Sequence, residues 1–159
     1  MTRSFKAIYK KQDTFSKLAK RSGYRSRSSI KLLEVQEKDK LIKPRSKVLD
    51  LGSSPGGWSQ VCKKIVGKQG LIFSVDKKVM EPISGVHYLN KSIEELTKED
   101  FEINNQNILP FDVVLSDIAP NISGISDIDN AQMIELLQKV KNCIDDFLNV
   151  NGHVLSKVF

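Results

Sequence analysis

A short apolar run, followed by a glycine-rich loop and an amphipathic helix, is the feature that most restricts the fold of this chain. It spans residues 47–67, with the sequence KVLDLGSSPGGWSQVCKKIVG. The predicted strands are apolar runs rather than alternating patterns, as expected when helices cover both faces of a sheet. A strand followed by a helix is the repeating unit of parallel α/β proteins, so this segment predicts a parallel sheet.

The same strand and helix pattern repeats along the chain. Repeated alternation of this kind is typical of an α/β fold with a doubly wound, mostly parallel sheet. We expect a first helix to begin near Ser28, with Ile30 and Leu33 on its apolar face. Strands are predicted over residues 47–51, 71–76, 86–90, 111–117 and 152–159, the last of them buried, and helices over residues 57–67, 93–101 and 129–150.

Basic residues are concentrated near the N-terminus. Residues 1–47 hold fifteen Lys/Arg against four Asp/Glu, whereas the remaining residues hold ten against fifteen. The length of 159 residues suits one domain, which we assign to residues 25–159, preceded by a basic arm over residues 1–24. A basic leader beside a mildly acidic body predicts contact with RNA or DNA, although a solvated basic tail would carry the same charges.

Composition disfavours several classes of protein. No run of eighteen apolar residues is present, so no membrane span is expected. Two histidines are too few for a His/Cys metal site, and no metal is predicted. Cys62 and Cys143 fall in helical patterns without the spacing of a disulfide framework, which favours buried thiols in a reducing cytoplasm. The N-terminus lacks the apolar core of a secretory signal, but an organellar transit peptide stays open.

The glycine loop GSSPGG, residues 52–57, restricts the ligand that the sheet can hold. It matches neither the dinucleotide-binding G-x-G-x-x-G pattern nor a P-loop; Pro55 removes a backbone donor, and Trp58 would crowd a diphosphate. Ligands of open α/β sheets lie beyond the carboxyl ends of the strands, where Asp50, Asp76 and Asp117 fall. A loop with few N–H donors and several neighbouring carboxylates suits a positively charged ligand better than a phosphate. S-adenosylmethionine is such a ligand, because it carries a sulfonium cation and no phosphate. Taken singly, the glycines also fit a tight turn, and Asp50 a helix cap.

Five stretches together resemble the FtsJ (RrmJ-type) ribose 2′-O-methyltransferases. They are RSRSSIKLLEVQEKDKLIKP, VLDLGSSPGGWSQV, MEPISGVHYL, LSDIAPNISG and the terminal KVF, in the expected order. The family uses S-adenosylmethionine and acts on ribosomal RNA, so the resemblance implies methylation of a uridine ribose of large-subunit ribosomal RNA within a ribosomal particle. By the same resemblance, the cofactor-binding residues are Asp50, Gly52, Ser54, Pro55, Gly56, Gly57, Trp58, Asp76, Ser92 and Asp117.

The resemblance also implies a catalytic set of Lys31, Asp117 and Lys157. Methyl transfer to a hydroxyl is an in-line displacement, for which the protein aligns the reactants and removes a proton. A lysine can accept that proton only when it is neutral, a state favoured by a neighbouring cation and opposed by a carboxylate. We therefore predict Lys157 as the proton acceptor, Lys31 as the residue that positions the RNA, and Asp117 as the partner of Lys157. An edge lysine that discourages strand pairing is the alternative for Lys157.

Two departures from the family pattern are visible. The family's last catalytic residue, a glutamate, lies in strands and a helix that would follow Phe159. We therefore expect the sequence to be a fragment without its C-terminal strands, which would leave sheet edges bare. The family often has an acid near the adenine after its third strand, where this chain has Ser92. The Ser92 hydroxyl or the backbone nearby would then make the adenine contact.

Arg25, Arg27 and Lys31 form a predicted RNA-binding track. Tyr24 beside them fits either stacking on a base or local packing. Phosphate contacts carry no sequence information, so the target nucleotide is not predicted. A transfer RNA methyltransferase, a non-catalytic RNA-binding module of ribosome assembly with the same fold, and a nicotinamide dehydrogenase are the alternatives, the last opposed by the glycine loop. We expect a monomer that acts in the cytoplasm.

Overall fold

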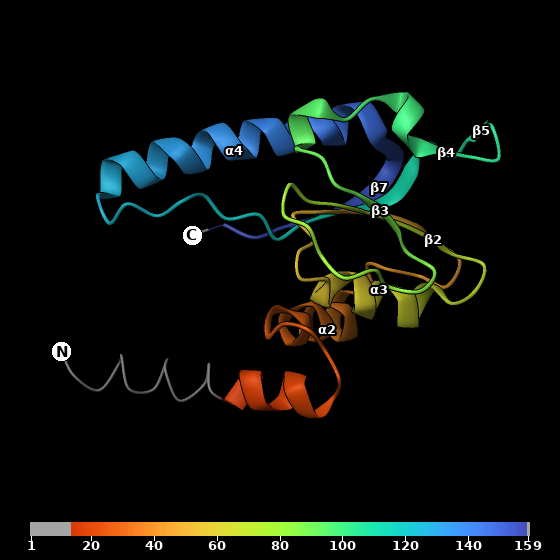
Figure 1. The fold of residues 1–159 in the computed structure, drawn as a ribbon, viewed down its shortest axis with the longest axis horizontal. Coiled ribbons are helices and arrows are strands. Elements are labelled where there is room, and N and C mark those ends of the chain that lie inside the picture. The colour runs from red at the N-terminus through yellow and green to blue at the C-terminus, as the bar shows by residue number, and fades with distance from the viewer. Residues whose placement is uncertain (1–13, 159) are drawn as a thin grey trace.

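The computed structural model describes residues 14–158, so half of the predicted basic arm lies outside the described residues. One five-stranded sheet has the order β3-β2-β1-β6-β7, and every neighbouring pair is parallel. The predicted α/β, mostly parallel fold is confirmed (Figure 1). The strands are β1 (Lys47–Leu51), β2 (Leu71–Val75), β3 (His87–Leu89), β6 (Phe111–Ser116) and β7 (Leu148–Ser156).

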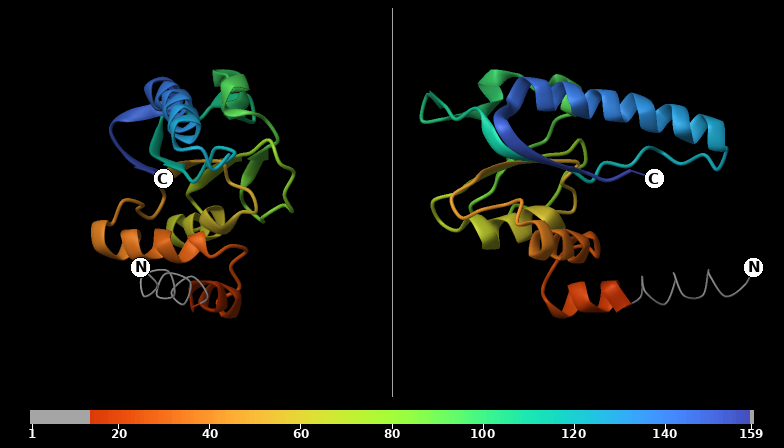
Figure 2. Two further views of the ribbon diagram at one scale, coloured as in Figure 1. Left: turned by 90° about the vertical axis from the view of Figure 1, so that its left-hand side faces the viewer. Right: turned by 180° about the vertical axis from the view of Figure 1, so that it is seen from behind.

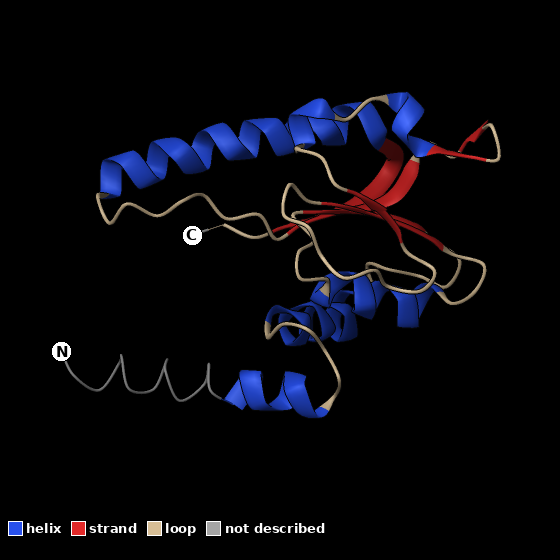
Figure 3. Ribbon diagram, viewed as in Figure 1, coloured by secondary structure: helices blue, strands red, loops and turns tan. Residues whose placement is uncertain are grey.

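Helices cover both faces of this sheet. The helices α2 (Ser28–Asp39) and α3 (Gly57–Val66) lie on one face, with a helix over residues 14–21 beneath them. The long helix α4 (Ser126–Phe147) lies on the other face, beside two short 3-10 helices, η1 (Ile93–Glu95) and η2 (Lys98–Phe101). Figures 2 and 3 show these layers from several sides. The arrangement is doubly wound, as predicted.

Alternating side chains of the central strands divide the apolar residues between two cores. On β1, Val48 packs in the core beneath α2 and α3, whereas Leu49 packs in the core beneath α4. On β6, Val113 and Val114 divide in the same way. Burying such a side chain is worth roughly 1.5–3 kcal/mol, so the two cores together fix the strands against each other. They also fix the positions of the loops that follow the strands.

Residues 93–101 do not form the single helix that was predicted. Ser92 begins η1 through a capping box with Glu95, and Thr97 begins η2 through a second capping box with Asp100. Each box satisfies the backbone of its own short helix. Two starts five residues apart leave no room for one continuous helix, so the prediction is wrong here.

A β-hairpin that was not predicted follows η2. It pairs β4 (Glu102–Ile103) with β5 (Gln106–Asn107). Asn104 and Asn105 form its turn with positive φ angles of 53° and 62°. Asparagine tolerates this conformation better than most residues, so the Asn-Asn pair was the available signal.

The last helix and strand lie about three residues earlier than predicted. The helix α4 begins at Ser126 and ends at Phe147, and residues 148–150 belong to β7. This strand forms one edge of the sheet, and within the described residues its outer side has no neighbour. Val154 is therefore 41% exposed and Val158 beyond it 61% exposed. The prediction of a buried final strand is wrong, whereas the expected bare edge is present.

Both cysteines are buried and free, as predicted, with Cys62 in α3 and Cys143 in α4. Burial raises the pKa of each thiol, which keeps both in the unreactive protonated form. None of the helices within residues 14–158 has both the length and the apolar character that crossing a membrane requires.

Candidate functional site

A cleft of about 610 Å³ lies at the carboxyl ends of the strands, and we call it the carboxyl-end cleft. Its walls come from the chain before α2, the glycine loop, the segments that follow β2, β3 and β6, and one face of α4. Because parallel strands end at the same edge, residues that directly follow them converge there. The predicted site residues that line the cleft are Arg27, Gly52, Ser54, Pro55, Asp76, Ser92, Asp117 and Lys157.

The glycine loop turns tightly over the end of β2. The backbone N–H groups of Gly52 and Ser53 both donate to the carbonyl of Val75, at 2.8 and 3.1 Å. Gly52 has a φ of +73°, and a Cβ there would lie 2.3 Å from Cγ1 of Ile118. A side chain at this position would therefore be strained and would also collide with the segment after β6. The close approach of these two segments forms the floor of the cleft.

Asp76 directly follows β2 and has both carboxylate oxygens held by backbone donors. Oδ2 accepts from the N–H of Ser54 at 2.8 Å, and Oδ1 accepts from the N–H of Lys78 at 2.8 Å. A carboxylate oxygen can accept more than one hydrogen bond, so lone pairs remain for a ligand. Asp76 is thus a fixed, negatively charged acceptor in the cleft, suited to a pair of hydroxyl groups.

Asp117 and Lys157 form an ion pair across neighbouring strand ends. Lys157 Nζ donates to Asp117 Oδ1, and both side chains are partly buried. The backbone supports the pair, since the N–H of Lys157 donates to the carbonyl of Ser116 at 2.9 Å. The parallel pairing of β6 with β7 therefore brings together two residues that are forty positions apart in the sequence.

Lys31, the third predicted catalytic residue, is exposed on α2 and is not among the residues that line the cleft. Ser28 lines the cleft one helical turn earlier, and residues three apart lie on the same side of a helix. Lys31 is therefore at the rim. The structure brings together two of the three predicted catalytic residues, Asp117 and Lys157, and leaves Lys31 outside the lining of the cleft.

Asp50 is fully buried beneath the glycine loop and does not line the cleft. Its Oδ2 accepts a hydrogen bond from the hydroxyl of Ser59 at 2.6 Å, whereas Oδ1 has no partner among the described residues. Burial, and to a smaller extent the negative charges of Asp117 and Asp76, raises the pKa of Asp50 to about 7. The predicted cofactor contact of its carboxylate stays a prediction, although Asp50 is not among the residues that line the cleft.

Trp58 also lies away from the cleft. Its indole is 5% exposed, packs in the core beneath α2 and α3, and donates to the carbonyl of Ser28 at 2.9 Å. Gly56 and Gly57 are likewise outside the lining. A Cβ on Gly57 would lie 2.0 Å from the hydroxyl of Ser26, so this glycine lets the start of α3 touch the chain just before α2. Trp58 and Gly57 therefore support the glycine loop through contacts on the side that faces away from the cleft.

Ser92 lines the cleft beside Glu94. Glu94 was not among the site residues predicted from the sequence. The Ser92 hydroxyl donates to the Glu94 carboxylate, and Lys139 of α4 donates to the same carboxylate at 2.8 Å. The hydrogen bond from Lys139 and, second, that from Ser92 lower the pKa of Glu94 to about 2. Lys139 and neighbouring residues of α4 complete this wall. No sequence signal identified them, because only packing decides which face of an amphipathic helix meets a cleft.

The predicted RNA-binding residues take different positions. Arg27 lines the cleft, whereas the Arg25 guanidinium donates to the backbone carbonyls of Pro55, Glu81 and Pro82. Tyr24 is half-buried against the core beneath α2 and α3, with the ammonium of Lys64 4.1 Å from its ring centroid. Local packing is therefore the interpretation of Tyr24 that the structure supports.

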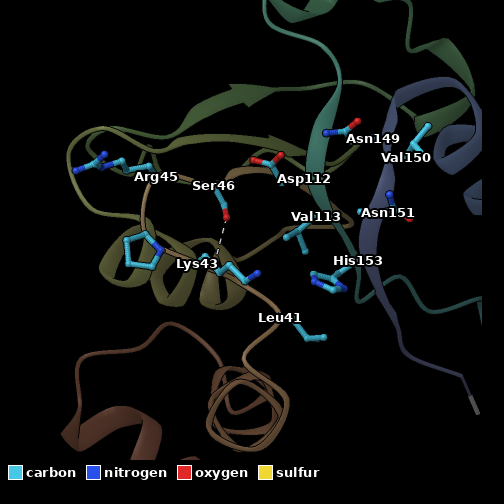
Figure 4. Close-up of a pocket in the computed structure, with 12 residues that line it drawn as sticks. Leu41, Lys43, Arg45, Ser46, Asp112, Val113, Asn149, Val150, Asn151 and His153 are labelled. Atoms are coloured by element: carbon cyan, nitrogen blue, oxygen red, sulfur yellow. Dashed lines mark hydrogen bonds between the residues drawn. The ribbon is translucent and has the colours of Figure 1, made fainter.

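A second pocket, of about 310 Å³, lies at the amino ends of β1, β6 and β7, and we call it the amino-end pocket. Arg45, Asp112 and His153 are among its lining residues (Figure 4). None of the predicted site residues lies there. Within residues 14–158, no group of three or more His, Cys, Asp or Glu side chains is arranged to hold a metal ion.

Comparison with known proteins finds sequences similar to most of this chain. A family model described as FtsJ-like methyltransferase matches residues 24–159. A protein of Chromobacterium violaceum named ribosomal RNA large subunit methyltransferase E is 41% identical over 150 residues, covering 92% of this chain and 72% of the relative. A protein of the same name from Francisella tularensis is 44% identical over 144 residues, covering 89% and 68%.

Solved structures show the same fold. A Plasmodium falciparum protein, described as a candidate ribosomal RNA methyltransferase, superposes with a TM-score of 0.72 at 27% identity. The match covers 83% of this chain and 77% of that one. A Lactococcus lactis protein described as a candidate hemolysin has a TM-score of 0.60 at 21% identity, covering 84% and 57%, and is similar in fold alone.

Proposed function

This chain belongs to the FtsJ-like methyltransferase family, and we propose that it transfers a methyl group from S-adenosylmethionine to a ribose 2′-hydroxyl of large-subunit ribosomal RNA. The observation that carries this proposal is the carboxyl-end cleft, with Asp76 and the Asp117–Lys157 ion pair in its lining. The relatives named as large-subunit ribosomal RNA methyltransferases support the choice of substrate.

The cleft fits the proposed cofactor on two grounds. The Asp76 carboxylate is fixed by two backbone donors and keeps lone pairs for the ribose hydroxyls of the cofactor. Gly52 keeps the floor free of a side chain that would collide with Ile118. When bound, S-adenosylmethionine supplies the activated methyl group and the leaving group. We assign Asp76 and Asp117, with the backbone of the glycine loop and of residues 91–92, to hold it.

Lys157 is the proposed proton acceptor for the ribose hydroxyl. Its ammonium must first release to solvent water the proton with which it binds Asp117. Asp117 can release Lys157 when it engages a second positive charge in the cleft, which favours the neutral amine. The ion pair also fixes the position of the amine, and alignment of a base with its hydroxyl contributes to the rate. Lys31 and Arg27, at the rim and in the lining, would bind the RNA backbone on the open side of the cleft.

Labelled methyl transfer tests the proposed function. The protein is incubated with S-adenosylmethionine labelled in its methyl group and with large-subunit particles, free ribosomal RNA or transfer RNA. We expect label in ribosomal RNA, with the highest yield in the particle, at a ribose whose 3′ linkage becomes resistant to alkali because its 2′-oxygen is blocked. Label in transfer RNA alone would favour the rival substrate. Cofactor binding without transfer to any RNA would overturn the catalytic proposal.

Further parts of the proposal concern the setting of the reaction. We propose that the basic segment before residue 25 helps to hold the RNA, because residues 1–47 carry a large excess of positive charge. Buried free thiols suit a reducing compartment, so we propose that the protein acts in the cytoplasm. We also propose that it acts as a monomer. Gel filtration and RNA binding as a function of salt concentration test these points.

A further inference from the structure

Three segments of the chain meet at the side chain of Arg25. Its Nη1 donates to the carbonyl of Pro55 at 3.2 Å and to the carbonyl of Glu81, and its Nη2 donates to the carbonyl of Pro82 at 3.0 Å. Pro55 belongs to the glycine loop, whereas Glu81 and Pro82 belong to residues 77–86, the loop that joins β2 to β3 and that we call the 77–86 loop. One guanidinium therefore bridges two loops.

The backbone of Arg25 is itself held in place by α3. Its N–H donates to Oε1 of Gln60 at 2.8 Å, and Nε2 of Gln60 donates to the carbonyl of Gly23 at 3.2 Å. This pair of hydrogen bonds fixes the chain on both sides of Tyr24 to the helix that follows the glycine loop. The guanidinium thus acts from a rigid base rather than from a free tail.

The two bridged loops also touch each other around the guanidinium. A Cβ on Gly56 would lie 2.7 Å from Cδ1 of Ile83 and 3.3 Å from Nη1 of Arg25. On the buried side, the hydroxyl of Ser53 lies 3.8 Å from the sulfur of Met80, which is only 7% exposed. The loops are consequently packed together, with Arg25 supplying the hydrogen bonds on the outer side of the contact.

Both loops contribute to the carboxyl-end cleft. Pro55 and Ser54 line it from the glycine loop, and Lys77 and Lys78 line it from the 77–86 loop. Ser54 donates to Asp76 from inside the cleft, while Arg25 binds the carbonyl of the next residue from outside. Asp76 and Arg25 therefore hold the same turn of the glycine loop from opposite sides, and Arg25 itself does not line the cleft.

The Arg25 guanidinium donates to backbone carbonyls, and within residues 14–158 no carboxylate forms an ion pair with it. Three carbonyls on two loops match the planar, multi-donor fork of arginine, which a lysine ammonium cannot reproduce. N–H groups engaged in this way are not available to a phosphate. Arg27 lines the cleft and Arg25 does not, so we assign the RNA contact to Arg27 rather than to Arg25.

We propose that Arg25 is a positioning residue of the cofactor cleft: it sets the separation of the glycine loop from the 77–86 loop and so preorganises the walls that hold S-adenosylmethionine. This role replaces the RNA contact expected for Arg25 from the sequence. It rests on the proposed function only for the identity of the cofactor, since the bridge itself is a property of the ligand-free protein.

Arg25→Lys is the informative variant, because it keeps the positive charge and removes the fork. Arg45→Lys, at the opposite end of the sheet, is the matched control. We expect Arg25→Lys to weaken S-adenosylmethionine binding in calorimetry by about tenfold, the scale of losing charge-assisted hydrogen bonds. The KM for the cofactor should rise with kcat nearly unchanged. RNA affinity should stay within about twofold, because the Arg25 side chain binds backbone carbonyls rather than phosphate and the variant keeps the net charge.

Hydrogen exchange of the ligand-free protein gives a second readout. We expect Arg25→Lys to speed amide exchange in residues 52–57 and 77–86 by about tenfold, with the Arg45→Lys protein unchanged. Gln60→Ala, which removes the support of Arg25 without touching either loop, should give a smaller change in the same residues. It replaces Arg25→Lys if that variant does not fold.

The outcomes separate this inference from the proposed function. A wild-type protein that binds no S-adenosylmethionine, together with loosened loops in Arg25→Lys, would refute the cofactor and leave the positioning role standing. A wild-type protein that binds the cofactor, with Arg25→Lys equal to it in affinity and exchange, would overturn the positioning role alone. Loss of RNA affinity in Arg25→Lys without any change in cofactor binding would also overturn it.

Discussion

The two ends of the same parallel sheet carry pockets of very different chemistry. At the amino end, Asp112 lines the pocket (Figure 4). Its Oδ2 accepts the N–H of Lys47 at 2.8 Å, so this carboxylate holds the start of β1 in place. At the carboxyl end, Asp76 is held by backbone donors, and Asp117 pairs with Lys157 inside the larger cleft. The acid at the amino end holds a strand in place, whereas the acids at the carboxyl end are themselves held by hydrogen bonds and line the cleft. The difference shows that concavity alone does not mark a site.

The largest expected effect comes from removing the amine at the carboxyl end. Lys157→Ala should lower kcat for methyl transfer by about 10²–10⁴-fold, the usual contribution of a general base. Cofactor affinity should change little, because the amine is assigned to the ribose hydroxyl. Single-turnover transfer of labelled methyl groups measures the rate, and Lys43→Ala at the amino-end pocket is the control. Wild-type rates in Lys157→Ala would refute its role as base.

The next effect compares one acid at each end. Asp76→Asn should weaken S-adenosylmethionine binding by about 10- to 100-fold, because a charged acceptor of hydroxyl hydrogen bonds is lost. Asp112→Asn should leave cofactor affinity unchanged and lower the free energy of unfolding by about 1 kcal/mol. Calorimetry and urea unfolding measure the two quantities. Equal effects of the two variants on cofactor affinity would erase the distinction between the ends.

Two glycine variants compare the cost in stability of a steric collision with the cost of a strained backbone conformation. Gly52 and Gly67 have φ angles of +73° and +72°, but a Cβ would collide with Ile118 only at Gly52. Gly67→Ala should cost about 1 kcal/mol of stability, whereas Gly52→Ala should cost about 2–4 kcal/mol. Thermal unfolding measures both. Equal losses of stability in the two variants would mean that the segment after β6 moves away from the added methyl group at little cost. The floor of the cleft would then not be rigid.

A last comparison concerns Asp50, the buried acid of β1 that lines neither pocket. The pKa of Asp50 is raised from 3.8 to about 7 by burial. The folded protein therefore binds this proton more tightly than the unfolded chain, and stability falls as pH rises from about 4 to 7. Asp50→Asn should remove this decline, which is on the order of 1 kcal/mol per pH unit. Parallel curves of unfolding free energy against pH for the two proteins would contradict this assignment.

Much of the fold was predictable because apolar runs and glycine turns are local signals. The strands around residues 47–51, 71–76 and 111–117 lie within a residue of their predicted bounds, since burial on both faces demands apolar side chains throughout. The exposed edge strand β7 was not predictable in this way, because an apolar run does not say whether a neighbour covers it. Capping boxes at Ser92 and Thr97 were readable signals that the helical pattern of residues 93–101 obscured.

The candidate site was predictable where residues directly follow strands and not where packing decides. Asp76, Asp117 and Lys157 meet in the cleft because parallel strands end together. The indole of Trp58 turns into the core instead, since a large apolar side chain at the start of a helix gains more from burial. The three carbonyl partners of Arg25 come from segments 30 to 57 residues away, and no local pattern encodes them.

A crystal structure of the protein with S-adenosylmethionine tests the central claim most directly. We predict the cofactor in the carboxyl-end cleft, with its ribose hydroxyls on the Asp76 carboxylate and its positive end beside Asp117 and Lys157. A cofactor bound in the amino-end pocket, or bound in the cleft without contact to Asp76, would contradict the assignment of this end of the sheet as the site of methyl transfer.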